Sequence, residues 1–244
     1  MLKKLAFSLT ELIVTVAIIG VIASMTIPTM MTKINNARNT AVIKEDYAIL
    51  QQVLRIAHHD GVITNYTTPD DRIETIKLFE NHFLPHMRVM RKCYGEEDCW
   101  SDKVLKLNGQ IGDAYQDNKG CGLGSITFHM FNGSSICMDD LYGTTITNEF
   151  GVESSNYIDL AFYIDVNGSW RKPNTYGKDI FIVIFNNNEQ GRMLPAGNDK
   201  TDEDVEKDCS AGGTGIYCLS YFMRKHGFRI KDLKLEDPLK QSSL

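Results

Sequence analysis

Several features that mark other protein classes are missing from this 244-residue sequence. It has no excess of positive charge: 26 lysines and arginines face 31 aspartates and glutamates, and the formal net charge is -5. We therefore expect no broad nucleic-acid-binding surface. The sequence also lacks a G-x-S-x-G nucleophile elbow, a P-loop, an H-E-x-x-H motif and a dinucleotide-binding fingerprint. These absences favour a protein that is not an enzyme and has no nucleic-acid partner.

Long hydrophobic runs are equally scarce, with one exception at the start of the chain. Residues 7–27 carry a single charged side chain, that of Glu11. A helix of this length rises about 31 Å, close to the hydrocarbon thickness of a bilayer. The apolar run at residues 180–185, by contrast, is only long enough for a strand. The sequence thus predicts one membrane-spanning helix followed by a water-soluble remainder.

The charges and cysteines around this segment indicate which side of the membrane the remainder occupies. Lys3 and Lys4 precede the segment, and positively charged flanks stay on the cytoplasmic side. All six cysteines follow the segment, and an even number of cysteines in an oxidising compartment is typical of disulfides. The C-x5-C spacing of the first two cysteines does not fit a zinc site. Proximity in the sequence favours three pairs among the possible connectivities: Cys93 with Cys99, Cys121 with Cys137, and Cys209 with Cys218.

Glu11 needs an explanation, because insertion scales put the cost of a central charge in an apolar span at roughly 2.5–3.5 kcal/mol. Its surroundings form a pattern. A short basic leader ends at Ala6, Phe7 follows, Gly20 lies at mid-span and Pro28 at the outer end. Over residues 1–30 the chain closely resembles type IV prepilins and the pseudopilins of type II secretion systems, which have a Glu as fifth mature residue. It departs from them at Ala6, where the family usually has Gly.

This resemblance implies processing and assembly. A prepilin peptidase would cut between Ala6 and Phe7 and methylate the new amine of Phe7. Glu11 of one subunit would pair with the Phe7 amine of a neighbouring pilin or pseudopilin subunit, so that two costly charges satisfy each other. Gly20 would permit close approach of helices, and Pro28 would bend or loosen the helix.

The function implied is that of a structural, minor subunit of a type IV pilus or a type II secretion pseudopilus. The chain would cross the bilayer of the bacterial cytoplasmic membrane once, with an extracytoplasmic head. Inner-membrane machinery would then assemble it into a periplasmic or cell-surface filament. Two alternatives stay open. An ordinary signal peptide could be cut after residues 21–23, releasing a secreted binding domain or enzyme, or the chain could be a single-pass monomer that never polymerises.

The expected fold is α+β, with a long N-terminal helix packed on an antiparallel sheet and with extra short helices and disulfides. The domains are the leader 1–6, the membrane and assembly helix 7–28, its amphipathic continuation 29–60, and the head 61–244. Apolar residues at helical spacing, Ala37, Ala41 and Ala48 among them, extend the helix to about residue 58 before the Asp60-Gly61 stop.

Two further helices are predicted in the head. One covers residues 69–84, with Thr68 as its cap, Ile73 on its apolar side and Pro85 ending it. The other covers residues 214–226, with Gly227 as its C-cap. Residues 199–208 are interpreted as an acidic surface loop.

Strands are predicted at residues 125–131, 135–138, 157–166, 180–185 and 192–194. Asn132-Gly133 and Asn167-Gly168 are typical hairpin turns. The segment 165–181 also resembles one found in larger pilin-like proteins. Asp165 and Asn167 offer hard oxygen ligands there and Asp179 can lie close, so calcium is a weak candidate beside a plain hairpin. No other cofactor is expected.

Overall fold

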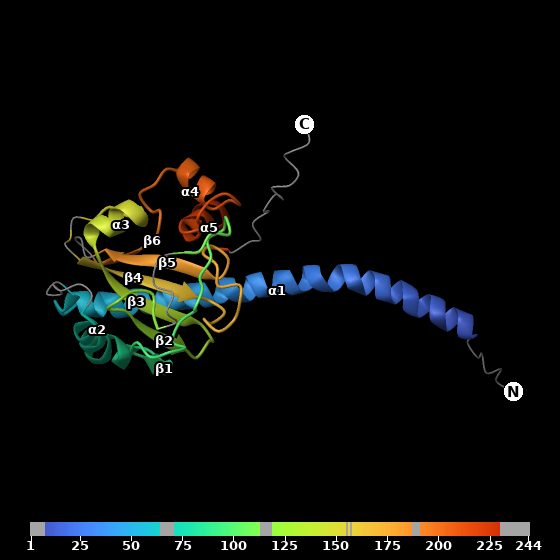
Figure 1. The fold of residues 1–244 in the computed structure, drawn as a ribbon, viewed down its shortest axis with the longest axis horizontal. Helices are drawn as coiled ribbons and strands as arrows, with labels where there is room; N and C mark the ends of the chain where they lie inside the picture. Colours follow the sequence, from blue (N-terminus) through green and yellow to red (C-terminus); the bar gives the residue numbers. More distant parts are fainter. Residues whose placement is uncertain are drawn as a thin grey trace.

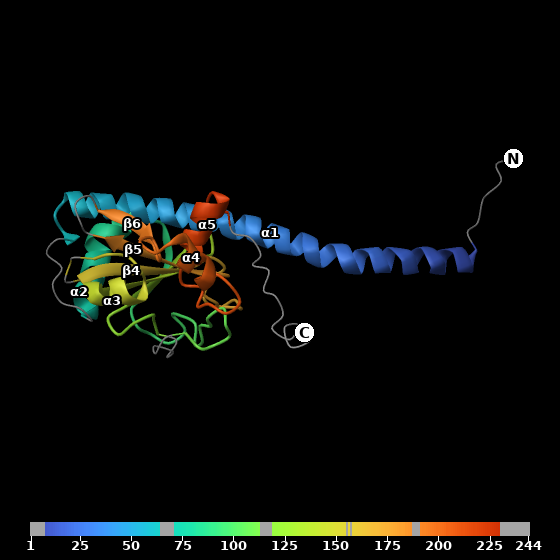
Figure 2. The ribbon, with the colours of Figure 1, turned by 90° about the horizontal axis from the view of Figure 1, so that it is seen from above.

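A long N-terminal helix and an antiparallel sheet dominate the structure, a computed structural model that describes residues 8–63, 71–112, 119–154, 156, 158–186 and 191–229. Helix α1 (Leu9–His59) is one continuous rod. Its first half projects from the head and its second half packs on it (Figures 1 and 2). The helix stops at Asp60 and Gly61, as predicted. The predicted leader and Phe7 lie outside the described residues.

The head is built on a sheet whose strands follow one another in chain order, each antiparallel to the next. The strands are β1 (Val89–Cys93), β2 (Ile126–Met130), β3 (Ser135–Tyr142), β4 (Ile158–Asp165), β5 (Ile180–Asn186) and β6 (Arg192–Pro195). A long helix packed on such a sheet confirms the predicted α+β, pilin-like fold. The sequence did not predict β1, which carries exposed side chains at its centre.

Both faces of the sheet are buried, and the period-2 alternation of the strands divides their side chains between two cores. Phe128, Phe162 and Phe181 belong to a core that includes Leu50 and Leu54 of α1. The alternate residues of β4 and β5 belong to a second core with the helix α3 (Gly143–Glu149): Ala161, Tyr163, Ile180, Ile182 and Ile184. Figure 2 shows α1 along one face of the sheet and α3 on the other side.

The packed half of α1 buries a narrower stripe than the sequence predicts. The buried residues are Val42, Ile43, Asp46, Leu50, Val53, Leu54 and Ala57. Ala37, Ala41 and Ala48, which were assigned to the apolar face, are exposed. Alanine occurs on either face of a helix, so it gives a weak signal of burial. The half-buried Tyr47 hydroxyl donates to the carbonyl of Met193 at 2.6 Å and ties the helix to β6.

The second predicted helix is shorter and less regular than expected. Helix α2 (Arg72–Leu78) begins after Asp71, whose carboxylate accepts from two backbone N–H groups, and continues into the π-helix η2 (Phe79–Phe83) and the 3-10 turn η3 (Leu84–His86). Thr68, the predicted cap, lies outside the described residues. Pro85 lies within η3 instead of ending the helix before it. Ile73 is 65% exposed, so it does not belong to the apolar side.

The C-terminal part of the head holds two short helices. The acidic segment predicted as a surface loop forms α4 (Asp202–Asp208), which Thr201 caps. The last helix, α5 (Cys218–His226), starts later than predicted but ends as expected, at Gly227 with a left-handed φ of 56°.

Three disulfides tie the head together in the pairs that proximity favoured. Their Cα atoms lie 5.6, 6.0 and 4.8 Å apart for Cys93–Cys99, Cys121–Cys137 and Cys209–Cys218. The second bond attaches the loop before β2 to strand β3, and the third joins the end of α4 to the start of α5. Each of these bonds fixes a loop segment to a regular element.

Candidate functional site: the exposed half of the long helix

The first half of α1 is apolar and uncovered. Its large apolar side chains are between 51% exposed at Val14 and 74% exposed at Leu9. No charged residue lies between Glu11 and Lys33. By length and composition, this is the one helix among the described residues that can cross a membrane, and its apolar window is wholly unburied in the head. A helix that packs in a soluble core would be mostly buried, so that explanation does not apply here.

Five hydroxyl side chains between residues 15 and 32 donate hydrogen bonds within the helix. Thr15, Ser24 and Thr32 donate to the carbonyls of Leu12, Val21 and Pro28 at 2.8 to 2.9 Å. The hydroxyls of Thr26 and Thr29 likewise donate to carbonyls of the preceding turn, those of Ile22 and Thr26. A polar group left unpaired in hydrocarbon costs several kcal/mol, whereas these internal bonds remove that cost. The exposed half is therefore chemically suited to a lipid environment.

Glu11 lies at the N-terminal end of α1 and forms a capping box with Ser8. The Ser8 N–H and hydroxyl both donate to Oε2 of Glu11, at 2.8 and 2.9 Å, and the Glu11 N–H donates to the Ser8 hydroxyl at 3.3 Å. This arrangement satisfies N–H groups at the helix start that have no partner within the helix. Sequence reasoning did not identify the cap, although Ser8-x-x-Glu11 is its usual signature. Ala6 and Phe7 lie outside the described residues, so their predicted roles stay predictions.

Gly20 and Pro28 both lie inside the continuous helix. A Cβ added to Gly20 would meet no atom within 4 Å. Nothing in the described chain therefore requires a glycine at this position. Pro28 removes one N–H donor from the helix, yet α1 runs through it, and the rod curves only gently (Figures 1 and 2).

The three calcium candidates lie together in the loop between β4 and β5. The Asn167 N–H donates to Oδ1 of Asp165 at 3.1 Å, and the Asn167 amide donates to Oδ2 of Asp179 at 3.0 Å. Asp179 also accepts from the N–H groups of Asn174 and Thr175. Asn167-Gly168 therefore opens a long, closed loop, and the expected two-residue hairpin is wrong, because Asp165 pairs with Ile180 across residues 166–179.

Burial raises the pKa of Asp179, and burial together with the charge of Asp179 raises the pKa of Asp165 well above its ordinary value. Three buried oxygens in this loop have no hydrogen-bond partner: Asp165 Oδ2, Asn167 Oδ1 and Asn174 Oδ1. Such hard oxygen atoms fit a calcium ion. The hydrogen bonds of Asp179 also explain the order of the loop without an ion, and calcium binding stays a prediction.

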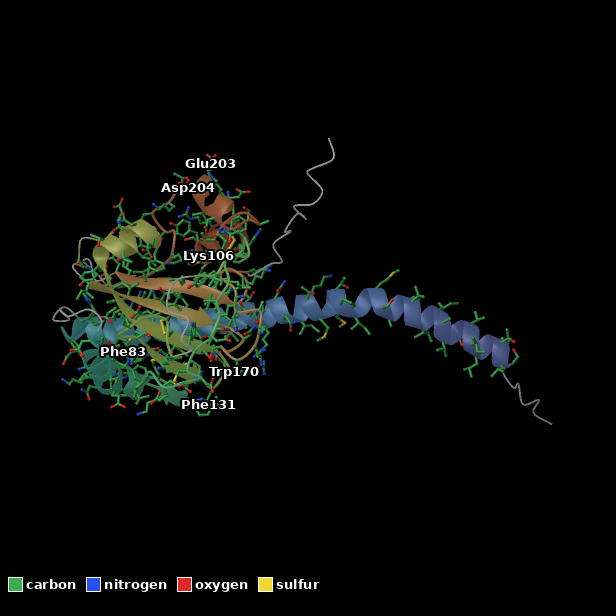
Figure 3. All side chains as sticks on the ribbon, viewed as in Figure 1. Phe83, Lys106, Phe131, Trp170, Glu203 and Asp204 are labelled. Atoms are coloured by element: carbon green, nitrogen blue, oxygen red, sulfur yellow. A yellow bond between two sulfur atoms is a disulfide. The ribbon has the colours of Figure 1, made fainter. Side chains whose placement is uncertain are left out.

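Two features of the head were not predicted from the sequence. Asp46 is fully buried on α1. Phe131 and Trp170 are exposed aromatic side chains on two adjacent turns of the sheet (Figure 3). Comparisons with known proteins add no identification: no protein-family model, no curated protein and no solved structure matches the chain.

Proposed function

We propose that this chain is a structural, minor subunit of a type IV pilus or a type II secretion pseudopilus. The observation that carries the proposal is the exposed half of α1, an apolar rod with a single carboxylate, that of Glu11, at its N-terminal end. Such a surface is stable in a bilayer or when packed against other apolar helices. The core of a filament would supply those helices. Leader cleavage before Phe7 would place a new amine four residues before Glu11.

The geometry at Glu11 is compatible with a bond between subunits. Among the described residues, the hydrogen bonds to the carboxylate go to Oε2. Oε1 can therefore accept from the Phe7 amine of a neighbour while the cap stays intact. In low dielectric the two charges stabilise each other only when the subunits are in register, because a displaced subunit leaves both unpaired.

Gly20 supports the same assembly. Glycine in a helix interior destabilises by roughly 1 kcal/mol relative to alanine, and no contact within the chain compensates for it. A neighbouring helix that approaches closely at this point would explain its presence, since small residues allow helix backbones to come together in apolar surroundings.

The test compares three variants of the full chain in its own cell. Glu11→Ala and Glu11→Gln should be cleaved and inserted normally but be absent from sheared filaments. Ser8→Ala is the matched control, because it breaks the capping box yet keeps the carboxylate, and it should still enter filaments. Incorporation of Glu11→Ala at the wild-type level would refute the proposal.

Mass spectrometry of the mature N-terminus provides an independent check. A methylated Phe7 supports the filament subunit. A start near Ser24 would mean that an ordinary signal peptidase removes Glu11 and most of the exposed half, and the proposal would fail.

A further inference from the structure

One end of the sheet faces the exposed half of α1. Ser135 pairs with Asp165, and Asp165 pairs with Ile180, so the β2–β3 turn and the β4–β5 loop lie at the same end of the strands. The opposite end of β5 reaches His58, whose ring centre lies 6.2 Å from that of Phe185. His58 is at the end of α1 farthest from its exposed half. The two turns are at the other end of the sheet, so they lie where the exposed half of α1 leaves the head (Figure 1).

This end carries aromatic and basic side chains that are largely exposed, although the ring of Trp170 also packs edge-on against that of His129. Phe131 is 71% exposed and Trp170 is 55% exposed, and Figure 3 labels both on the part of the head nearest the projecting helix. A pocket of about 370 Å³ between residues 32–39 of α1 and the β4–β5 loop is lined by four basic side chains, by uncharged polar ones and by a single carboxylate, that of Asp179. Together these residues form the proximal surface: Arg38, Phe131, Trp170, Arg171, Lys172 and Lys178.

The charge of the proximal surface is positive. Its four basic residues are exposed, and none of the ion pairs found among the described residues uses them. The nearest carboxylates do not offset them at the surface, because Asp165 and Asp179 are buried and held by the loop. Glu45 is exposed and its carboxylate accepts from the Asn132 amide of the β2–β3 turn at 3.2 Å, but it lies two turns of α1 farther from the membrane-capable segment than Arg38, and it is one charge beside four basic ones.

The length of α1 sets the depth of this surface in a membrane. The segment without any charge between Glu11 and Lys33 is residues 12–32, which also rises about 31 Å; with Glu11 at the inner edge of the hydrocarbon, Lys33 lies at its outer edge. Arg38 follows five residues later, about 8 Å farther along the helix. The headgroup layer extends roughly 5–8 Å beyond the hydrocarbon on each side. Arg38, whose side chain lies beside Gly133 of the β2–β3 turn, is thus at the depth of the lipid phosphates.

We propose that the proximal surface binds the phosphate groups of anionic phospholipids in the outer leaflet around α1 and seats the head on the bilayer before assembly. This inference rests on the proposed placement of α1 in a membrane. Arginine and lysine pair with lipid phosphates, and tryptophan is favoured at the interface between hydrocarbon and water. The proximal surface has both features, basic side chains for the phosphates and a tryptophan for the interface, at the same end of the head.

Trp170 provides the test, because the chain has only two tryptophans and the other, Trp100, is buried. The Trp100→Phe full chain is reconstituted at low protein density in vesicles of phosphatidylcholine, with or without phosphatidylglycerol. Lipids brominated near the headgroup should quench Trp170 at least about twofold more strongly in the anionic vesicles. The excess should disappear in about 1 M salt, since exposed charges are then screened.

Charge variants separate this surface from general attraction. Arg171→Gln/Lys172→Gln should reduce quenching in anionic vesicles to the level seen without phosphatidylglycerol. Arg55→Gln/Lys77→Gln removes the same charge at the far end of the head and should leave quenching unchanged. A photoreactive phospholipid gives a second readout on the wild-type chain, with crosslinks expected in peptides that contain Phe131 or Trp170, should the Trp100→Phe chain fold poorly.

Three results would overturn the proposal. The first is equal quenching of Trp170 in the two vesicle types. The second is that Trp170 remains as accessible to a soluble quencher as it is in detergent. The third is that Trp170 becomes shielded only as the protein density rises. The last result would assign the surface to a second copy of the chain. Resistance to carbonate extraction, measured in parallel, separates the two proposals: a chain that inserts without quenching defeats only the lipid-binding proposal, and a chain that does not insert defeats both.

Discussion

Asp46 makes the stability of the head depend on pH in a predictable direction. Its side chain is fully buried on α1, where Oδ1 accepts from the Asn132 amide at 2.8 Å and Oδ2 has no partner. Burial is the main cause that raises the pKa of Asp46 from 3.8 to about 6, and the charge of Glu45 adds to it. The interactions of the carboxylate with Asn132 and Ser134 lower the pKa but do not compensate for burial.

The raised pKa fixes the sign and size of the effect. The folded protein holds the proton of Asp46 more tightly than the unfolded chain does, so this group stabilises the fold fully below pH 3.8. That contribution is lost as the pH rises through about 6. A tenfold change in proton affinity corresponds to about 1.4 kcal/mol, so the difference between 3.8 and about 6 corresponds to about 3 kcal/mol.

The test is the difference in unfolding free energy between Asp46→Asn and the wild type, measured by chemical denaturation of the full chain in detergent between pH 4 and pH 8. Because pH 4 lies just above 3.8, the variant should gain about 2 kcal/mol of this relative to the wild type between pH 4 and pH 8. Glu203→Gln, which removes an exposed carboxylate from α4, is measured in parallel as the control for the loss of a surface carboxylate. A constant difference for Asp46→Asn would refute the reasoning.

Three further predictions concern the stability of the head, each measured as the free energy of unfolding. Phe128→Ala empties a fully buried position between the sheet and η2 and should cost about 3–5 kcal/mol; a loss below 1 kcal/mol would contradict the packing. Replacing Cys121 and Cys137 by serine opens a loop with a sequence separation of 16 residues and should cost about 3 kcal/mol in non-reducing conditions, with no change under reducing ones. Gly177→Ala should cost more than Gly109→Ala, by about 1–3 kcal/mol, because both glycines have positive φ but only at Gly177 would the new Cβ collide with a disulfide sulfur.

The parts of the fold that the sequence predicted are those with strong local signals. The apolar run before Lys33 and the Asp60-Gly61 stop defined α1, and the Asn132-Gly133 turn joins β2 to β3 as expected. The buried strand β5 is one continuous apolar run, since both faces of the sheet are covered. The disulfide pairs followed from proximity in the chain.

The features that were missed or assigned wrongly depend on distant contacts or on weak patterns. Strand β1 pairs only with β2 and exposes its centre, so no apolar alternation marks it. Helix α4 carries a local signal in its cap, because the Thr201 hydroxyl accepts from the Asp204 N–H, but its run of acidic residues is equally typical of a surface loop. The loop opened by Asn167 is set by Asp179, twelve residues away, and a turn motif alone cannot reveal it.

The proximal surface was also beyond sequence reasoning. Trp170 and Phe131 are far apart in the chain, and only the register of β3 and β4 places their turns at one end of the sheet. The membrane-capable helix, in contrast, could be recognised from composition alone. Local patterns thus identified the anchor, whereas the surface that would meet the lipid required the tertiary structure.

Because α1 is one continuous helix, it fixes the rotational orientation of the head about the helix axis relative to Glu11. Each residue turns an α-helix by about 100° and advances it by about 1.5 Å. One residue inserted near Pro28 would therefore swing the head by more than a quarter of a revolution relative to Glu11, while seven inserted residues would nearly restore its heading and lift it by about 10 Å. In the proposed filament, the number of residues in the rod would thus determine which flank of the head meets the adjacent subunit.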